Sequence, residues 1–170
     1  MTGPGAAESG RPGPKADGHP RVAVIGVGNE FRRDDGIGPA VVAWLRGRVP
    51  GTVDLLVSDG DPARLIEAWS GADLAVVVDA VRASPAVPGR LHRLILGEGN
   101  PAEPYPVSSH GLGLGEAVGL AQALGRLPGR LIVHAVEAAD LSTGTGLSPA
   151  VAAAADALAA AVLADVSAGT

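Results

Sequence analysis

The sequence predicts an α/β fold in which helices are layered over a β-sheet. From Val22 onwards, short aliphatic runs alternate with helix-like segments, which is the pattern of a layered α/β domain. Two of these runs, 21–27 and 72–81, are continuous and rich in β-branched residues, as in strands that are buried on both faces. The chain has 170 residues, enough for one domain with a substantial core, and shows no internal repeat. We therefore expect a single α/β domain over residues 21–167.

The first four elements follow from the apolar runs and the turn residues between them. Residues 21–27 are expected to form a buried central strand. A helix should follow over 36–48, because apolar residues recur at helical spacing and Pro39 falls in the first turn, where proline is tolerated. Residues 53–58 predict a second strand after a Pro-Gly turn. Residues 62–69 predict a short helix that begins with proline behind a capping aspartate.

The middle of the chain predicts two strands, a long loop, a helix and a last strand. Residues 72–81 give the strongest strand signal, whereas residues 89–96 alternate more and are typical of an edge strand. The proline-rich segment 97–109 is too long for a plain connector and is therefore a candidate binding loop. A helix is expected over 111–124 and a strand over 129–137.

The two ends of the chain have different compositions. An alanine-rich helix is expected from Pro149 to about Val166, with Ser148 as its cap. Residues 1–20 are rich in Gly and Pro and lack the apolar segment of a signal peptide, so we expect a disordered tail. Since we also see no run near the membrane-spanning length of about 20 apolar residues, we expect a soluble, cytoplasmic protein without a membrane partner.

Composition excludes several classes of function. The net charge of −5 and the pI of about 5.2 disfavour binding to nucleic acid, and only 2% of the residues are aromatic, which disfavours a base-stacking surface. The chain has no cysteine, which excludes disulfides, thiolate metal sites and a cysteine nucleophile. No Gly-x-Ser-x-Gly motif of a serine hydrolase occurs. Any metal must be held by His, Asp or Glu.

Three side chains at strand or loop ends are candidates for a functional site. Asp34 and Asp35 are adjacent and must point in different directions, so one can cap a helix or support the loop while Asp35 faces a cleft. Asp79 lies near the carboxyl end of the strand 72–81, where ligands bind in open α/β sheets. His110 lies at a loop-to-helix junction beside glycines that leave room for a ligand.

A doubly wound fold can bring Asp35, Asp79 and His110 to one end of the sheet. Two carboxylates and an imidazole suit Ni²⁺, Zn²⁺ or a similar divalent ion, with positions left open for water or substrate. Structural roles compete with this interpretation, because an Asp often caps a helix and a lone His is usually packed or solvated. His92 and His134 lie inside strands, where packing as neutral side chains is expected.

The stretch "GVGNEF" raises nucleotide binding as an alternative. A dinucleotide-binding loop needs a third glycine three residues after Gly28, and that position is Phe31. The simpler interpretation is that Gly26 and Gly28 permit a tight turn from a strand into a loop.

Four motifs, in this order, resemble the hydrogenase maturation proteases: "VIGVGNEFRRDDGIGPAVV", "VVVDAV", "SSHGLGLGEAV" and "GTGLSPAV". These endopeptidases trim the C-terminal extension of the large subunit of nickel-iron hydrogenases. The resemblance covers about residues 21–165. It implies a three-layer domain with a twisted, mostly parallel five-stranded sheet sandwiched by helices, of the phosphorylase/hydrolase-like kind.

The resemblance also implies the site and its ligand. In that family the metal is bound by the second acid of the adjacent pair, the acid at the end of the long strand and the histidine of the "SH" motif. These positions fall on Asp35, Asp79 and His110, which would serve both as metal ligands and in catalysis. The ion implied is Ni²⁺, supplied by the substrate. The partner implied is a hydrogenase large-subunit precursor, and we expect the chain to be a monomer. Relatives often have an acid followed by proline after the last strand, whereas this chain has Glu137-Ala138.

The resemblance leaves two interpretations from different classes. In the first, the chain is a metal-dependent or aspartic-type endopeptidase. In the second, the same fold serves as a nickel-dependent docking or checkpoint protein without catalysis, or as a nucleotide-binding module.

Overall fold

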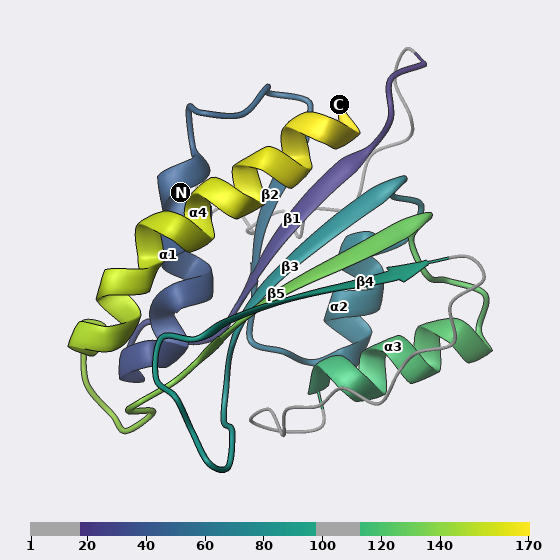
Figure 1. The fold of residues 1–170 in the computed structure, drawn as a ribbon. Helices are drawn as coiled ribbons and strands as arrows, with labels where there is room; N and C mark the ends of the chain where they lie inside the picture. Colours follow the sequence, from purple (N-terminus) through teal and green to yellow (C-terminus); the bar gives the residue numbers. More distant parts are fainter. Residues whose placement is uncertain (1–17, 98–112) are drawn as a thin grey trace, which may run out of the picture.

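The computed structural model describes residues 18–97 and 113–170 and contains a five-stranded sheet with strand order β2-β1-β3-β5-β4 (Figure 1). The strands are β1 (Val22–Val27), β2 (Val53–Ser58), β3 (Leu74–Val81), β4 (Leu91–Gly97) and β5 (Arg130–Glu137). β1, β2, β3 and β5 run parallel, and β4 pairs antiparallel with β5 at the edge. The predicted α/β class, with its mostly parallel sheet and its edge strand, is confirmed.

Helices cover both faces of the sheet and complete the three layers. They are the 3₁₀ turn η1 (Arg33–Gly36), α1 (Ile37–Leu45), α2 (Pro62–Trp69), α3 (Gly113–Ala123) and α4 (Pro149–Gly169). α1 and α4 lie on one face, and α2 and α3 lie on the other (Figure 1). Alternate residues of β3 pack into the two cores: Val76 and Val78 face α1 and α4, while Ala75 and Val77 face α2 and α3.

Element boundaries differ from the predicted ones in ways that have local causes. The helix predicted over 36–48 begins as a 3₁₀ turn and ends at Leu45, since Arg46 is extended and Gly47 adopts a positive φ of 76°. The cap predicted for α2 is confirmed, because the Asp61 side chain accepts a hydrogen bond from the Arg64 amide at 3.0 Å. Ser148 does precede α4, but its side chain makes no capping hydrogen bond to that helix.

The expectation that no apolar stretch approaches membrane-spanning length is wrong for α4. This helix has 21 residues with a mean hydropathy of 1.7, which is long and apolar enough to span a membrane by length and composition alone. The hydropathy comes mainly from its many alanines. In the structure one stripe of α4 packs on the sheet through Val151, Leu158, Val162 and Val166.

Two segments named in the sequence analysis fall mostly outside the described residues. They are the tail predicted for 1–20, of which only Gly18–Pro20 are described, and the loop predicted for 97–109, of which only Gly97 is described.

Two glycines allow α1 to lie directly against β1. A Cβ atom at Gly26 would be 2.3 Å from the Gly38 carbonyl oxygen, and a Cβ atom at Gly38 would be 2.4 Å from the Val27 carbonyl oxygen. Because these neighbours are backbone atoms, no side-chain rotation can make room. The close approach fixes the first turn of α1 at the carboxyl end of β1.

We expect opposite effects from two glycine-to-alanine substitutions in helices. Gly38→Ala should lower the free energy of unfolding by about 1–3 kcal/mol, because the new methyl group overlaps backbone. Gly119→Ala in α3 should raise it by about 0.5–1 kcal/mol, because nothing lies within 4 Å of that position and alanine favours helix. Urea unfolding of both variants measures the difference. Equal stabilisation by the two substitutions would contradict the close approach of α1 to β1.

Candidate functional site

Asp35 is held at the carboxyl end of β1 by the loop that precedes it. Its Oδ2 atom accepts a hydrogen bond from the Asn29 amide at 3.0 Å, and the side chain is buried. Gly28 has a φ of 135°, and a Cβ atom there would be 1.9 Å from the Asp35 carbonyl oxygen. Glycine at this position is therefore what allows Asp35 to lie against the end of β1.

Asp79 lies near the carboxyl end of β3, which is the strand next to β1. It is 5% exposed, and burial together with the nearby charge of Asp35 raises its pKa from 3.8 to about 8. Within the part of the chain that the structure describes, no Lys, Arg or His forms an ion pair with it. The structure thus brings Asp35 and Asp79 together as a buried pair of carboxyl groups.

The third predicted ligand, His110, lies outside the described residues. Among residues 18–97 and 113–170, no group of three His, Asp or Glu side chains is arranged to hold a metal ion. Asp35 and Asp79 nonetheless provide two neighbouring carboxylates, which are ligands suited to a divalent cation. A bound cation could replace the proton on Asp79. The pair can therefore hold part of a metal site or exchange a proton near neutral pH.

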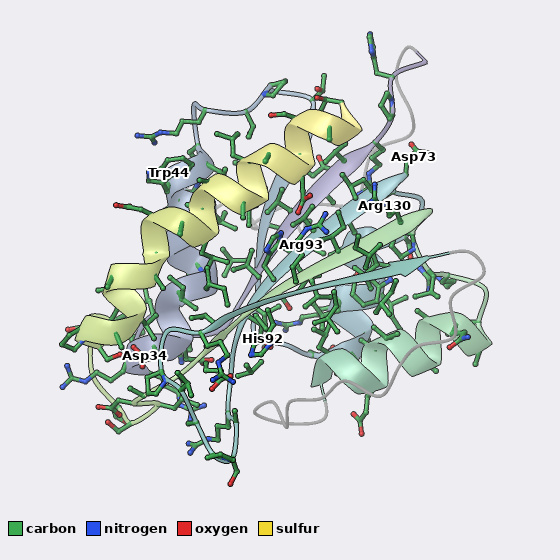
Figure 2. The ribbon with its side chains drawn as sticks, viewed as in Figure 1. Asp34, Trp44, Asp73, His92, Arg93 and Arg130 are labelled. Carbon is green, nitrogen blue, oxygen red and sulfur yellow. The ribbon has the colours of Figure 1, made fainter. Side chains whose placement is uncertain are left out.

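Asp34 supports a different loop, and Figure 2 labels it beside the first turns of α1 and α4. Its carboxylate accepts hydrogen bonds from the amides of Ala139, Asp140 and Ser148 and from the Ser148 hydroxyl, at 2.6–2.9 Å. Asp34 is fully buried. The alternative that it caps the following helix is wrong, since neither η1 nor α1 has a side-chain cap. The prediction that adjacent aspartates point in different directions is confirmed.

The glycine turn after β1 does not provide a phosphate cradle. The Gly28 amide donates to the Ser58 carbonyl oxygen at 2.9 Å, and the Asn29 amide donates to Asp35. A phosphate needs such amides to be unoccupied. The third position of the nucleotide-binding pattern is Phe31, whose side chain is 60% exposed. These contacts disfavour the nucleotide-binding alternative.

The two strand histidines have different surroundings. His134 is 3% exposed, burial lowers its pKa, and its Nε2 atom lies 2.7 Å from Asp165 Oδ2. The expectation of a packed, neutral side chain holds for His134. His92 instead has 27% of its side chain exposed and lies 2.8 Å from Glu137 Oε1.

The contact between His92 and Glu137 was missed in the sequence analysis. Figure 2 shows His92 and its neighbour Arg93 on opposite sides of β4, with Arg93 toward α4, where it contacts Asp165. Alternation along the strand predicts these opposite directions. It does not predict which residues of β5 lie beside them, because that depends on the pairing register.

Comparisons of this chain with known proteins agree on one family. The sequence profile of the hydrogenase maturation protease family matches residues 42–165. A hydrogenase 2 maturation protease of Escherichia coli is 28% identical over 133 residues, which cover 77% of this chain and 81% of that protein. The hydrogenase expression/formation protein HupD of Bradyrhizobium diazoefficiens is 31% identical over 136 residues, covering 77% of this chain and 70% of that protein.

A solved structure shares both fold and sequence with this chain. The hydrogenase maturating endopeptidase HybD from E. coli aligns with a TM-score of 0.68 and 26% identity. The alignment covers 86% of this chain and 91% of that chain. The three-layer arrangement of the sheet and helices is therefore shared over most of both proteins.

We expect Asp79→Asn to stabilise the metal-free protein at high pH. Since the folded-state pKa of Asp79 is about 8 and its ordinary value is 3.8, folding favours the protonated form, and stability falls as the pH rises from about 4 to 8. The substitution should remove this fall and raise the free energy of unfolding at pH 8 by roughly 1–3 kcal/mol. Urea unfolding in chelator at pH 5, 6.5 and 8 measures it, with the exposed helix acid Asp156→Asn as control. Parallel pH profiles for wild type and Asp79→Asn would contradict the prediction.

Asp34→Ala should destabilise the fold without acting on the carboxylate pair directly. It leaves the amides of Ala139, Asp140 and Ser148 without the buried carboxylate that accepts from them, so we expect a loss of roughly 3 kcal/mol. Thermal unfolding measures the loss. Asp140→Ala is the matched control in the same loop, because that exposed side chain accepts hydrogen bonds only from Ser142 within the described residues. Equal losses for the two variants would contradict the role given to Asp34.

Proposed function

The chain belongs to the hydrogenase maturation protease family, and from this premise we propose that it is an endopeptidase for a [NiFe] hydrogenase large-subunit precursor. It removes the C-terminal extension of that precursor after nickel has been inserted. The observation that carries the proposal is the buried pair of Asp35 and Asp79 at the carboxyl edge of the sheet. This is the edge where open α/β folds bind their ligands.

The proposed recognition of nickel rests on the chemistry of the pair. Asp35 and Asp79 provide two carboxylates, and the family resemblance adds the imidazole of His110. Burying two acids together is unfavourable unless a proton or a cation compensates the charge. A cation carried in by the precursor meets that need, so the nickel is part of the substrate, and the protease alone is expected to bind little of it.

The residues of the chain have separate roles in the proposed reaction. Nickel, when bound, supplies a Lewis acid near the scissile carbonyl. Asp35 is oriented by the Asn29 amide and remains fixed as a ligand. Asp79 would give up its proton when the cation binds, and its carboxylate is then the base that accepts a proton from the attacking water. The non-catalytic docking alternative uses the same ligands without that proton transfer.

Nickel-loaded and nickel-free forms of a purified precursor test the proposal. We expect the wild-type chain to release one discrete C-terminal peptide from the nickel-loaded form only, as followed by intact mass. Asp79→Asn should slow cleavage at least about 100-fold, because it removes both a ligand and the proposed base. Asp156→Asn, on the exposed side of α4, should cleave at the wild-type rate.

Three outcomes would count against the proposal. Binding of nickel-loaded precursors without any cleavage would favour the docking alternative. Equal cleavage of both precursor forms would remove the role of nickel. Wild-type rates for Asp79→Asn would remove the carboxylate pair from the reaction.

A further inference from the structure

The edge strand places a histidine in the same row of the sheet as Asp79. Asp79 of β3 pairs with Ala135 of β5, and Ala135 pairs in turn with His92 of β4. Residues paired across neighbouring strands project from the same face of a sheet. Asp79 and His92 therefore share a face, with only the methyl group of Ala135 between them in that row. Two strand spacings separate their backbones by about 10 Å.

A buried carboxylate holds the His92 ring. Glu137 is 2% exposed, and its Oε1 atom lies 2.8 Å from His92 Nε2, while its Oε2 atom accepts from the Val87 amide at 2.5 Å. The hydrogen bonds from Val87 and His92 lower the pKa of Glu137, so the carboxylate is ionised and can only accept. Nε2 of His92 therefore donates to Glu137.

The loop between β3 and β4 makes this arrangement rigid. The Gly89 amide donates to the Glu137 carbonyl oxygen at 2.8 Å, and the Glu137 amide donates to the Arg90 carbonyl oxygen at 3.0 Å. The Arg90 guanidinium lies 3.8 Å from Glu137 Oε1. Both the backbone and the side chain of Glu137 are thus fixed, and the ring that it holds has a defined orientation.

His92 also has an accessible nitrogen, unlike the other strand histidine. Its contact with Glu137 uses Nε2, which leaves Nδ1 as the atom that can meet a substrate, and 27% of the side chain is exposed. The pair of His134 and Asp165 has the same chemistry, but it lies on the opposite face and His134 is 3% exposed. Only the His92 pair faces the side of the sheet that carries Asp79.

We propose that His92 is a catalytic residue of the peptide cleavage, protonating the leaving amine, and that Glu137 is its positioning residue. This inference rests on the proposed function. Water adds its hydroxyl group to the scissile carbonyl carbon, and its proton passes to the base. As the C–N bond breaks, the proton on Nδ1 of the His92 imidazolium passes to the departing nitrogen. The base then returns its proton to His92 through solvent, so no proton is gained or lost over the cycle.

The geometry fits a substrate between the two groups. A base and an acid on opposite sides of a scissile bond must be separated by the width of the peptide that lies between them. The row spacing of about 10 Å provides that separation.

Turnover of the nickel-loaded precursor by His92→Ala tests the assignment, with His134→Ala as the matched control. We expect His92→Ala to lower kcat by about 10²–10⁴-fold with KM within about twofold of wild type. Added imidazole should raise the kcat of His92→Ala by at least about tenfold and leave the kcat of His134→Ala unchanged. Glu137→Gln should lower kcat by about tenfold or more without altering KM. His92→Gln serves as a second variant, and thermal unfolding monitors the fold of all variants.

The outcomes separate this inference from the proposed function. Wild-type kcat for His92→Ala, beside an active wild type, would overturn the role of His92 alone. A loss of kcat that imidazole does not restore would assign His92 a structural role and overturn the inference, as would unfolding of both His92 variants. Failure of the wild-type chain to cleave any nickel-loaded precursor would overturn the proposed function, and the role of His92 with it.

Discussion

The contact of the η1 segment with the end of β1 is the constraint on which the site depends. At Gly28 the space of a side chain is filled by the backbone of Asp35, and at Gly26 it is filled by the backbone of Gly38. Backbone atoms cannot rotate away as side chains can, so these glycines fix where Asp35 lies. Because β3 is hydrogen-bonded to β1 on that side of the sheet, Asp35 is brought beside Asp79.

The acids of this protein differ in how their burial is compensated. Asp34 accepts hydrogen bonds from a loop, Glu137 accepts from an amide and a histidine, and Asp165 contacts Arg93 and His134. For these side chains the fold itself supplies the partners. Asp79 is buried beside another acid and has no ion pair with any residue of the described ranges, 18–97 and 113–170. Such a group lowers stability, so its place at the ligand-binding edge favours a function over a structural role.

Much of the fold was predictable because the strand signals are local. Continuous β-branched runs mark β1 and β3, and the alternation in β4 marks the edge strand. Asp35 and Asp79 were predictable as candidates because each lies at the end of an element. The hydrogen bonds of Asp34 were not, since its partners lie more than a hundred residues further along the chain. Helix ends were also misplaced, because backbone turns such as the one at Gly47 depend on local geometry.

Because β4 runs antiparallel, a search of the sequence for residues at the carboxyl ends of strands does not find His92. In parallel strands, the residues at the ligand-binding edge are the last of each strand, and Asp79 follows that rule. β4 runs the other way, so its first residues, Leu91 and His92, lie at that edge, opposite Val136 and Ala135. A shift of the pairing by one residue would turn Arg93 to this face in place of His92. The chemistry at the edge thus depends on strand direction and register together, and neither can be inferred from β4 alone.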